Sequence, residues 1–496
     1  AGRLGGERGR CGAQLGRDGM TKEILWTAEA AATATGGALC AKGGPEDEWT
    51  ATGVSIDTRT LEPGDLFVAL KDVRDGHAFV ANAFEAGAAA ALVSHAPESL
   101  PEGAPLLMVP DVLQGLRDMG AAARTRAKKR VAVTGSVGKT STKEMLRAAL
   151  SVSGKTHASV KSFNNHWGVP ITLARMAPDT EYGVFEIGMN HAGEITPLTK
   201  FAAPDVAIIT IIGEAHIEFF DSKDGIAEAK AEIFFGLKEG GAAILNRDDP
   251  YFDLLANRAK ERGAGRILTF GAGAGADVRV LKVSETSGGS RIEAEIFGEQ
   301  RAFDLSAFGR HQAMNAAAVI AAAHALGAPL DNTLKGLGAL VAVDGRGARG
   351  AIPASGGGAA TLIDESYNAN PTSMAAAAAV LKSAVPGAGG RRIAVLGDML
   401  ELGEDGPGLH AALADVFKDA EADKIYAAGP LMAHMWAGLP EAVRGAHAET
   451  TKELVDAVAS DIRAGDVVMV KGSLGMKMSV IIEALKSQTE PARKQA

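Results

Sequence analysis

The stretch VAVTGSVGKTSTKE, from Val131 to Glu144, decides the fold class of this 496-residue chain. It begins as an apolar run and turns through glycines into the tripeptide Gly138–Thr140. The next segment places apolar side chains at helical spacing, namely Met145, Leu146, Ala149 and Leu150. The pattern predicts a buried strand, a glycine turn and a helix. Because the first glycine is Gly135, the loop reads G-x-x-G-K-T, shorter than the common G-x-x-x-x-G-K-[ST] loop.

A glycine turn that opens a helix suits a phosphate group. Backbone N–H groups at a helix N-terminus point at an anion, and the helix dipole favours negative charge there. We expect Lys139 to reach the β- and γ-phosphates of a nucleotide and Thr140 to give its hydroxyl to Mg²⁺. Glycine is abundant, with 61 residues, so strand, loop and helix together carry this prediction. The predicted nucleotide loop comprises Gly135, Ser136, Val137, Gly138, Lys139, Thr140 and Ser141.

Composition argues against several classes of protein. The net charge of -9 disfavours an electrostatic grip on nucleic acid or acidic lipid, and an aromatic content of 5% disfavours base-stacking platforms. No apolar run approaches the roughly 18 residues that a membrane span needs. The two cysteines, Cys11 and Cys40, are too few for a disulfide scaffold and fit a reducing cytoplasm.

Short apolar runs alternate with alanine-rich helical stretches along most of the chain. Examples are DLFVAL, YGVFEIG, DVAIITII, RRIAVLGD and DVVMVKG. This alternation predicts an α/β fold with parallel sheets covered by helices on both faces. The glycine-rich stretch GAGAGAD is read as a loop entering a β-rich insertion, and PASGGGAA as a hairpin turn.

Changes in composition suggest the domain limits. Residues 1–19 are rich in Gly and Arg and are expected to be a disordered extension, and residues 489–496 a polar tail. Met20 opens a segment, MTKEILWTAEAAATATGG, that is expected to form an amphipathic helix. With boundaries near 109 and 341, three α/β domains are expected: residues 20–109, 110–341 and 342–488.

Polar side chains follow two of the predicted strands. Glu186 ends YGVFEIG, and His216 lies just beyond DVAIITII. Ligand sites form at the carboxyl ends of parallel strands, so a glutamate and a histidine there could share a divalent cation. Taken alone, however, a histidine beyond a strand is more often structural. Lys230 lies in a helical segment where a lone lysine is usually solvated, so spacing alone assigns it no function.

Taken together, these stretches resemble the Mur ligases, a family of ATP-dependent amide-forming enzymes of peptidoglycan assembly. The shortened loop TGSVGKTS is the family's usual form. NRDDP, with Asn246 and Asp248, looks like its nucleotide-side turn. GRHQAMNAAA resembles its adenine-contacting helix, with Asn315 in the matching place and Gln312 where asparagine is commoner. DGRG places Arg346 at the family's arginine near the junction of the central and C-terminal domains.

Within the family, four stretches are similar to the member that adds D-alanyl-D-alanine: NNHWGVP, EIGMNHAGEI, DESYNANPTSM and VLGDMLELG. The D-N-P-R signature frequent in the member that adds the third amino acid is not found. The resemblance assigns Asp364 to the ATP site. It assigns substrate contacts to Asn164, Asn165, Asn190, His191, Tyr367, Asn368, Asn370, Lys471 and Ser473. SIDTRTLEPGDLFVAL looks like the UDP-sugar segment, with Ser55, Asp57, Thr58 and Arg59 near the diphosphate. Leu474 departs from the polar or basic residue usual after Ser473.

The resemblance implies a UDP-sugar-binding N-terminal α/β domain, a central P-loop ATPase-type domain with a mainly parallel sheet, and a C-terminal Rossmann-like domain. It implies that ATP phosphorylates the carboxylate of UDP-N-acetylmuramoyl-tripeptide and that D-alanyl-D-alanine then attacks the acyl phosphate. Lys139, Glu186, His216 and Lys230 would be the catalytic residues. Two Mg²⁺ ions would be held by Thr140, Glu186, His216 and Lys230, the last as a CO₂-derived carbamate.

The same resemblance implies a cytoplasmic monomer whose C-terminal domain swings about a hinge near residues 341–347. A folylpolyglutamate-type synthase would share the loop, the metal site and the chemistry, but DESYNANPTSM and the UDP-sugar segment speak against it. A P-loop GTPase would need the longer loop and an N-K-x-D guanine reader, neither of which is found.

Overall fold

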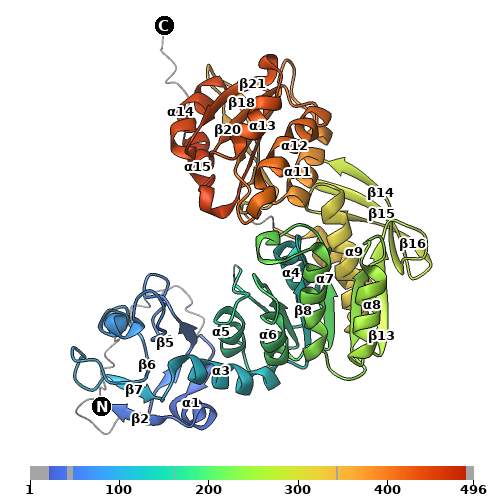
Figure 1. Ribbon diagram of the computed structural model, residues 1–496. Coiled ribbons are helices and arrows are strands. Elements are labelled where there is room, and N and C mark those ends of the chain that lie inside the picture. The colour runs from blue at the N-terminus through green and yellow to red at the C-terminus, as the bar shows by residue number, and fades with distance from the viewer. Residues whose placement is uncertain (1–21, 42–47, 161, 342–343, 488–496) are drawn as a thin grey trace, which may run out of the picture. The chain divides into compact units, whose positions relative to one another are not determined.

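The computed structural model describes residues 22–41, 48–160, 162–341 and 344–487 (Figure 1). The chain divides into two compact units, Ala1–Gly115 and Leu116–Ala496. The expected extension at residues 1–19, the residue Met20 and the tail at 489–496 lie outside the described residues. Both units are built from sheets of mainly parallel strands with helices between them, which confirms the predicted α/β fold.

The first unit is organised around a five-stranded sheet with the order β2-β7-β6-β5-β4. Its strands β4 to β7 run parallel, and β2 joins β7 antiparallel. Phe67, Val80 and Leu106 form part of its apolar core. The elements are β1 Trp26–Thr27, α1 Ala28–Thr35, β2 Ala38–Ala41, β3 Thr50–Ala51, β4 Gly53–Ser55, β5 Asp65–Val68, η1 Gly76–Phe79, α2 Val80–Glu85, β6 Ala90–Val93 and β7 Pro105–Met108.

The amphipathic helix expected in the segment that Met20 opens begins later than predicted. Helix α1 covers only Ala28–Thr35, and the Thr27 hydroxyl accepts a hydrogen bond from the Ala30 N–H at 3.1 Å. Trp26 and Thr27 instead pair antiparallel with β3, and Trp26 is buried. A capping threonine and a strand pairing that buries the indole therefore fix the helix start.

The second unit begins with a lobe built on a nine-stranded sheet of order β16-β15-β14-β13-β12-β11-β8-β10-β9, here called the central lobe (residues 116–341). Its strands are β8 Lys129–Thr134, β9 Thr156–Ala158, β10 Tyr182–Glu186, β11 Val206–Ile209, β12 Ala242–Asn246, β13 Arg266–Gly271, β14 Val278–Thr286, β15 Gly289–Ile296 and β16 Glu299–Leu305. Strands β8 to β13 pair in parallel, and β14 pairs in parallel with β13. Strands β14, β15 and β16 pair antiparallel and form the β-rich insertion predicted after GAGAGAD.

Helices cover both faces of this sheet. One face carries α4 Lys139–Ser151, α9 Arg310–Ala325 and α10 Leu330–Gly338. The other carries α5 Gly168–Ala174, α6 Ile195–Ala202, α7 Lys223–Ala231 and α8 Phe252–Glu261. Further elements are α3 Val112–Ala123, which crosses the boundary between the units in sequence, η2 Arg124–Arg126, η3 Ile217–Phe219 and η4 Glu232–Gly236. Met145, Leu146, Ala149 and Leu150 are all buried on α4, as their spacing predicts.

The C-terminal lobe (residues 344–487) is built on a six-stranded sheet of order β17-β18-β22-β19-β20-β21. Strand β17 is antiparallel to β18 across the predicted PASGGGAA turn, and the other strands are parallel. Its elements are β17 Ala348–Pro353, β18 Ala359–Glu365, α11 Pro371–Ser383, β19 Arg392–Gly397, η5 Gly403–Asp405, α12 Gly406–Asp419, β20 Lys424–Ala428, α13 Met432–Gly438, η6 Glu441–Val443, β21 Arg444–Ala448, α14 Thr451–Asp461, β22 Val467–Lys471, η7 Leu474–Met476 and α15 Ser479–Ser487.

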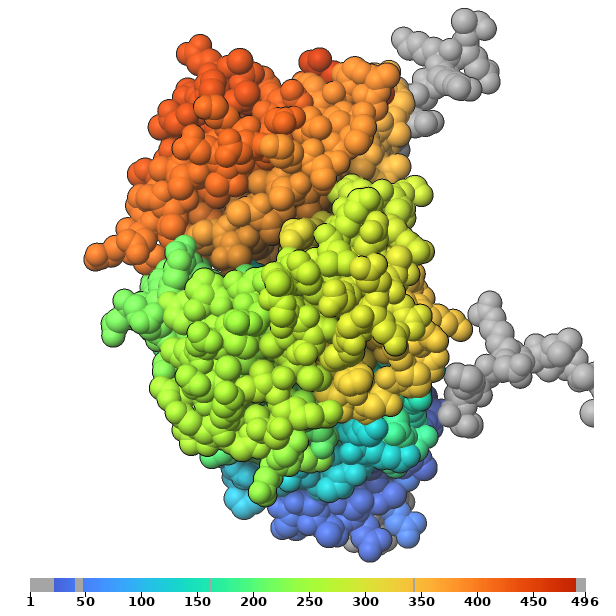
Figure 2. All heavy atoms as spheres, turned by 90° about the vertical axis from the view of Figure 1, so that its right-hand side faces the viewer, coloured from blue at the N-terminus to red at the C-terminus, as the bar shows by residue number. Residues whose placement is uncertain are grey.

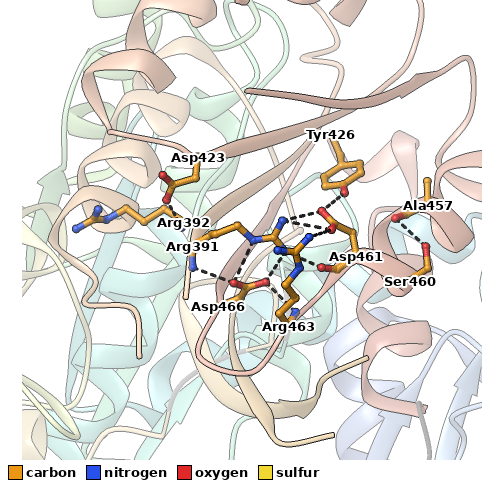
Figure 3. Close-up of polar contacts among 9 residues, drawn as sticks. All are labelled: Arg391, Arg392, Asp423, Tyr426, Ala457, Ser460, Asp461, Arg463 and Asp466. Carbon is orange, nitrogen blue, oxygen red and sulfur yellow. Dashed lines mark hydrogen bonds and ion pairs between the residues drawn. The ribbon is translucent and has the colours of Figure 1, made fainter. Parts of the chain in front are cut away.

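An ionic network joins the ends of several elements of this lobe (Figure 3). The Arg391 guanidinium, just before β19, donates to Asp461 at 3.0 Å and to Asp466 at 2.8 Å. Asp461 ends α14 and also accepts from the Tyr426 hydroxyl at 2.7 Å, while Asp466 precedes β22. Arg463 donates to both aspartates. The network therefore fastens β19, β20, β22 and α14 to one another at one edge of the sheet.

Candidate active site

The candidate site lies where the order of the central sheet changes direction. Strand β8 is flanked by β10 on one side and β11 on the other. The chain passes from β8 to β9 and β10 on one side, and then crosses to β11 and β12 on the other. Open α/β sheets bind ligands at the carboxyl ends of strands at such a switch point. The glycine loop follows β8, Glu186 ends β10, and Asn246 ends β12.

Two glycines of the loop occupy places where a side chain would collide. Gly135 has a φ of 148°, and a Cβ there would overlap the Thr210 hydroxyl. Gly138 precedes α4 with a φ of 85°, and a Cβ there would lie 2.7 Å from Asn315 Oδ1. The Thr210 hydroxyl donates to the Val137 carbonyl at 2.5 Å and holds the loop against β11. The glycines thus allow a tight loop that lines the cavity and leads into α4.

Lys139 is held inside this loop. Its ammonium donates to the Gly135 carbonyl at 2.6 Å. Burial lowers the pKa of Lys139, which the nearby Glu186 carboxylate opposes and Arg346 reinforces. Lys139 is therefore a half-buried amine held at the loop where phosphate oxygens would lie.

Glu186 joins the glycine loop to the segment after β9. Its carboxylate accepts from the Thr140 hydroxyl at 2.8 Å and from the Asn164 amide at 2.8 Å, and the residue is 1% exposed. A hydroxyl and a carboxylate are oxygen ligands of the kind that Mg²⁺ prefers, so this donor set fits the ion. The described residues contain no group of three or more His, Cys, Asp or Glu side chains placed to hold a metal. A magnesium site here would need the threonine hydroxyl, substrate oxygens and water.

His216 lies beyond β11 and pairs with the C-terminal lobe. Its Nδ1 is 2.6 Å from Glu401 Oε2, and its own backbone is left-handed with a φ of 62°. Burial and the Lys139 charge lower the pKa of His216, while Glu401 acts in the opposite direction.

Lys230 lies near the end of α7 and is 1% exposed. Burial, reinforced by the Lys139 charge, holds the pKa of Lys230 well below its ordinary value. None of the hydrogen bonds or ion pairs among the described residues uses its amine. A buried amine of this kind is neutral more readily than an exposed lysine.

The nucleotide-side residues form two small hydrogen-bonded groups. The Asn246 amide oxygen accepts from the Asp248 N–H at 3.0 Å, and Asp248 accepts from the N–H groups of Ala272 and Gly273. The Asn315 amide donates to the Gln312 side chain at 3.2 Å, and both residues are buried. Gln312 therefore serves as an internal partner of Asn315.

Ser162 is where the two lobes meet at the site. Its hydroxyl accepts from the Tyr367 hydroxyl at 2.9 Å and from the Arg346 guanidinium at 3.4 Å, and lies 3.3 Å from the Thr140 hydroxyl. The Arg346 guanidinium stacks 4.0 Å above the Tyr367 ring. In the C-terminal lobe the Lys471 ammonium donates to the Asn368 carbonyl at 2.9 Å, and its burial lowers its pKa against the opposing charge of Glu365.

These side chains surround one cavity of about 1000 Å³ in the second unit. The sequence-predicted residues that line it are Ser136, Val137, Gly138, Lys139, Thr140, Ser141, Asn164, Glu186, Asn190, His216, Asn246, Asp248, Asn315, Arg346, Tyr367, Asn368, Asn370 and Lys471. Residues of both lobes thus share a single space, which is the arrangement that a reaction with several substrates requires.

Other predicted residues are not in its lining, which does not include Gly135, Asn165, His191, Lys230, Asp364 or Ser473. The Asn165 side chain accepts from the Gly168 N–H at the start of α5, and Asp364 accepts from the Ser366 N–H and hydroxyl. His191 pairs with Glu194 at the surface, and the Ser473 hydroxyl accepts from the Leu400 N–H. The first unit contains Ser55, Asp57, Thr58 and Arg59. There the Asp57 carboxylate accepts from the Arg59 guanidinium, which lowers the pKa of Asp57 to about 2.

The cavity also contains residues that the sequence did not single out. Ser162, His311 and Glu365 line it. His311 and Glu365 stand inside stretches already quoted, beside Asn315 and Tyr367. The sequence could have indicated both residues, because His311 lies one helical turn from Asn315 and Glu365 lies two residues from Tyr367. Ser162 had only its nearness to Asn164 as a signal.

No helix in the described part of the chain is both long and apolar enough to cross a membrane. Three family models match: "Mur ligase family, catalytic domain" at residues 50–148, "Mur ligase middle domain" at 133–323, and "Mur ligase, glutamate ligase domain" at 352–474.

The UDP-N-acetylmuramoyl-tripeptide–D-alanyl-D-alanine ligase of Bacillus subtilis (strain 168) is 38% identical over 438 residues, which cover 87% of this chain and 93% of that protein. The crystal structure of MurF from Acinetobacter baumannii has a TM-score of 0.78 at 30% identity, covering 93% of this chain and 99% of that one. MurF from Thermotoga maritima in complex with ADP has a TM-score of 0.72 at 27% identity, covering 88% and 97%. The resemblance noted in the sequence is thereby confirmed, and this chain belongs to the Mur ligase family.

Proposed function

We propose that this chain is an ATP-dependent amide ligase that joins D-alanyl-D-alanine to UDP-N-acetylmuramoyl-tripeptide in cytoplasmic peptidoglycan precursor synthesis. The observation that carries the proposal is the single cavity in which the glycine loop and Glu186 face Tyr367, Asn368 and Lys471 of the other lobe. The reaction named for the Bacillus subtilis relative supports the choice of substrates.

The first step requires a carboxylate to approach the γ-phosphate of ATP, although both are anionic. Lys139 would supply a half-buried positive charge at the loop, and Arg346 would supply a second at the junction of the lobes. Charges preorganised in a site that excludes water stabilise the transferring phosphoryl group more than they would in solution. The carboxylate oxygen attacks the γ-phosphorus, ADP leaves, and an acyl phosphate forms.

In the second step the amine of D-alanyl-D-alanine attacks the acyl carbon and inorganic phosphate leaves. Residues of the C-terminal lobe that line the cavity, among them Tyr367, Asn368 and Lys471, would orient this amine and exclude water. Exclusion of water matters because an acyl phosphate hydrolyses readily.

We further propose that Thr140, Glu186, His216 and a carbamylated Lys230 hold two Mg²⁺ ions. Bound Mg²⁺ would neutralise phosphate charge and orient oxygens for in-line transfer. The burial of Lys230 supports the modification, because only a neutral amine adds to CO₂, forming an N–C bond and releasing a proton. The carbamate replaces a cation by an oxygen ligand.

The UDP-sugar would bind the first unit at Ser55, Asp57, Thr58 and Arg59. The Arg59 side chain is 82% exposed and already bound by Asp57, so its guanidinium is oriented at the surface. We likewise propose the functional division into residues 20–109, 110–341 and 342–488, acting as a monomer.

The decisive experiment is phosphate release by the purified chain with ATP and Mg²⁺. We expect release to require both UDP-N-acetylmuramoyl-tripeptide and D-alanyl-D-alanine. Folate with glutamate serves as the control pair for the sister class of ligases. Release with that pair alone would preserve the nucleotide site but refute the proposed substrates.

A further inference from the structure

Glu401 and His216 form a contact between the two lobes at the edge of the cavity. His216 follows β11 of the central lobe, and Glu401 follows β19 of the C-terminal lobe. Glu401 Oε2 lies 2.6 Å from His216 Nδ1. Both residues have left-handed backbones, with φ of 63° for Glu401 and 62° for His216. Non-glycine residues rarely adopt this conformation, so two in contact indicate a geometry that the surrounding structure enforces.

The loop that carries Glu401 is fixed by its own lobe. The Met399 N–H donates to His410 Nε2 at 2.9 Å, and the Leu400 N–H donates to the Ser473 hydroxyl at 2.9 Å. Leu402, on the other side of Glu401, is 4% exposed in the core. The glutamate is therefore presented from a braced loop.

The turn that carries His216 is held by both lobes. Ile217 packs against the core cluster of the central lobe and also against that of the C-terminal lobe. The Phe219 N–H donates to the His216 carbonyl at 3.0 Å and closes the turn. Contact between the lobes consequently sets where the imidazole lies.

This contact determines which nitrogen of His216 carries the proton. An ionised carboxylate only accepts hydrogen bonds, so Nδ1 must be the donor. In the neutral imidazole Nε2 then keeps its lone pair, and no hydrogen bond among the described residues occupies it. The His216 imidazole lines the cavity, whereas Glu401 does not. The other charged neighbours of the imidazole are Lys139 and Lys230.

We propose that Glu401 is a positioning residue that the C-terminal lobe supplies to the metal site. By accepting from Nδ1, it fixes the tautomer and direction of His216 so that Nε2 serves as a metal ligand. Partners of this kind behind a metal-binding histidine commonly change metal affinity 10–100-fold when removed. The contact between lobes thereby completes the site, an inference that rests on the proposed magnesium-dependent function.

Two substitutions separate this role from a purely structural one. Glu401→Gly relaxes the left-handed backbone and removes the acceptor, so folding should be preserved. Glu401→Gln keeps an oxygen acceptor at the same reach. Glu404→Ala is the matched control, because Glu404 is an exposed acidic residue three positions further along, in η5. Each variant is examined as the full chain with ADP.

Two readouts do not depend on turnover. Electron paramagnetic resonance measures Mn²⁺ affinity, and ¹⁵N NMR reports the His216 tautomer, assigned with a His216→Asn variant. We expect Glu401→Gly to bind Mn²⁺ about 10-fold or more weakly and to populate both tautomers. Glu401→Gln should stay within about 3-fold of the wild type, since it keeps the acceptor, and Glu404→Ala should match it.

Unchanged Mn²⁺ affinity and tautomer in Glu401→Gly would overturn the proposal. Equal losses of Mn²⁺ affinity in Glu401→Gln and Glu401→Gly, with the His216 tautomer unchanged in Glu401→Gln, would also overturn it, because the carboxylate charge rather than the tautomer would then set the affinity. Both results are independent of the muramoyl substrates, so a failure of the proposed function would appear only in the phosphate-release experiment.

Discussion

Two buried lysines near the glycine loop differ in a way that bears on their roles. Lys143 is fully buried, and its ammonium contacts the Ser159 carbonyl at 2.8 Å and the Glu144 carboxylate at 2.8 Å. Lys230 is equally buried, but none of the hydrogen bonds or ion pairs in the described parts of the chain uses its amine. A buried charge without partners is strongly disfavoured. Lys143 therefore fits a structural role, whereas Lys230 fits a neutral or modified amine.

Lys230→Ala is accordingly expected to lose about 100-fold or more of the phosphate-release rate, because the proposed carbamate oxygen ligand disappears. Formate or acetate, which can occupy the vacated place, should restore part of it. Lys223→Ala on the same helix is the control, since Lys223 is half-exposed. This variant should neither lose activity nor gain any with formate or acetate. Full activity in Lys230→Ala would contradict the carbamate.

The sequence predicted that Lys139, Thr140 and Glu186 belong to the candidate site because local sequence patterns place these residues. A strand, a glycine loop and a helix fix the first two, and a strand end fixes the third. Ser162 could not be found this way. Its hydrogen bond from Tyr367 joins residues 205 positions apart in the sequence, and pairings at that separation depend on how whole lobes pack.

At the scale of elements, the strand–loop–helix unit from β8 to α4 depends on the absence of a side chain at position 135. Gly135→Ala would drive a methyl group into Thr210, so the loop must shift away from β11. We expect nucleotide affinity to fall about 10-fold or more, as measured by calorimetric titration with ADP. Gly350→Ala is the control, because nothing lies within 4 Å of a Cβ there. Wild-type affinity in Gly135→Ala would show that the loop adapts.

The ionic network around Arg391 predicts how the C-terminal lobe responds to acid (Figure 3). Burial would raise the pKa of Asp461, but hydrogen bonds from Tyr426 and Arg391 hold it below its usual value. A lowered folded-state pKa contributes stability that is complete above the unfolded value of about 3.9 and is lost as pH falls through the folded value. The free energy of unfolding should therefore decline below about pH 4.

Asp461→Asn should reduce that dependence on pH and cost about 1.5–3 kcal/mol at neutral pH, the typical worth of a hydrogen bond to a charged group. Urea unfolding at several pH values measures both effects. Asp456→Asn is the matched control, because Asp456 is exposed on the same helix. If the free energy of unfolding of Asp461→Asn falls with pH as steeply as that of the wild type, other carboxylates cause the loss of stability in acid.

Elements were predictable where one signal dominates. Buried parallel strands read as continuous apolar runs, and the late strands β19, β20 and β22 all appear where such runs lie. The start of α1 was not predictable from periodicity, because the pairing of Trp26 with β3 competes with helix formation. Tertiary pairing outweighs local propensity in that segment.

At the scale of the whole molecule, the hairpin formed by β14 and β15 of the central lobe contacts the C-terminal lobe. In Figure 1 the strands β14 and β15 lie beside helix α11, and Figure 2 shows the yellow-green surface of this region against the orange surface of the C-terminal lobe. Glu285 on β14 accepts from Arg349 at 3.2 Å and from the Ser383 hydroxyl at 2.6 Å. Arg349 also stacks 3.5 Å from the Phe308 ring.

Because many of these contacts are hydrogen bonds and ion pairs, which water can replace, the lobes are expected to separate and close as substrates come and go. X-ray scattering should show a smaller radius of gyration when ADP and UDP-N-acetylmuramoyl-tripeptide are present. Glu285→Ala should reduce that compaction and raise KM, whereas Glu293→Ala on the same hairpin should not. A radius of gyration that is indifferent to ligands would contradict the closure.

Helix α9 has a consequence of another kind. Its residues from Ala316 to Ala323 are at most 1% exposed, and six of the eight are alanines. A helix lined with methyl groups approaches its neighbours closely, so a larger side chain at almost any of these positions would overpack by about 1–3 kcal/mol. Larger side chains are thereby excluded from a stretch without reactive groups, and saturation mutagenesis should find there a long run of intolerant positions, as strict as the run in the glycine loop.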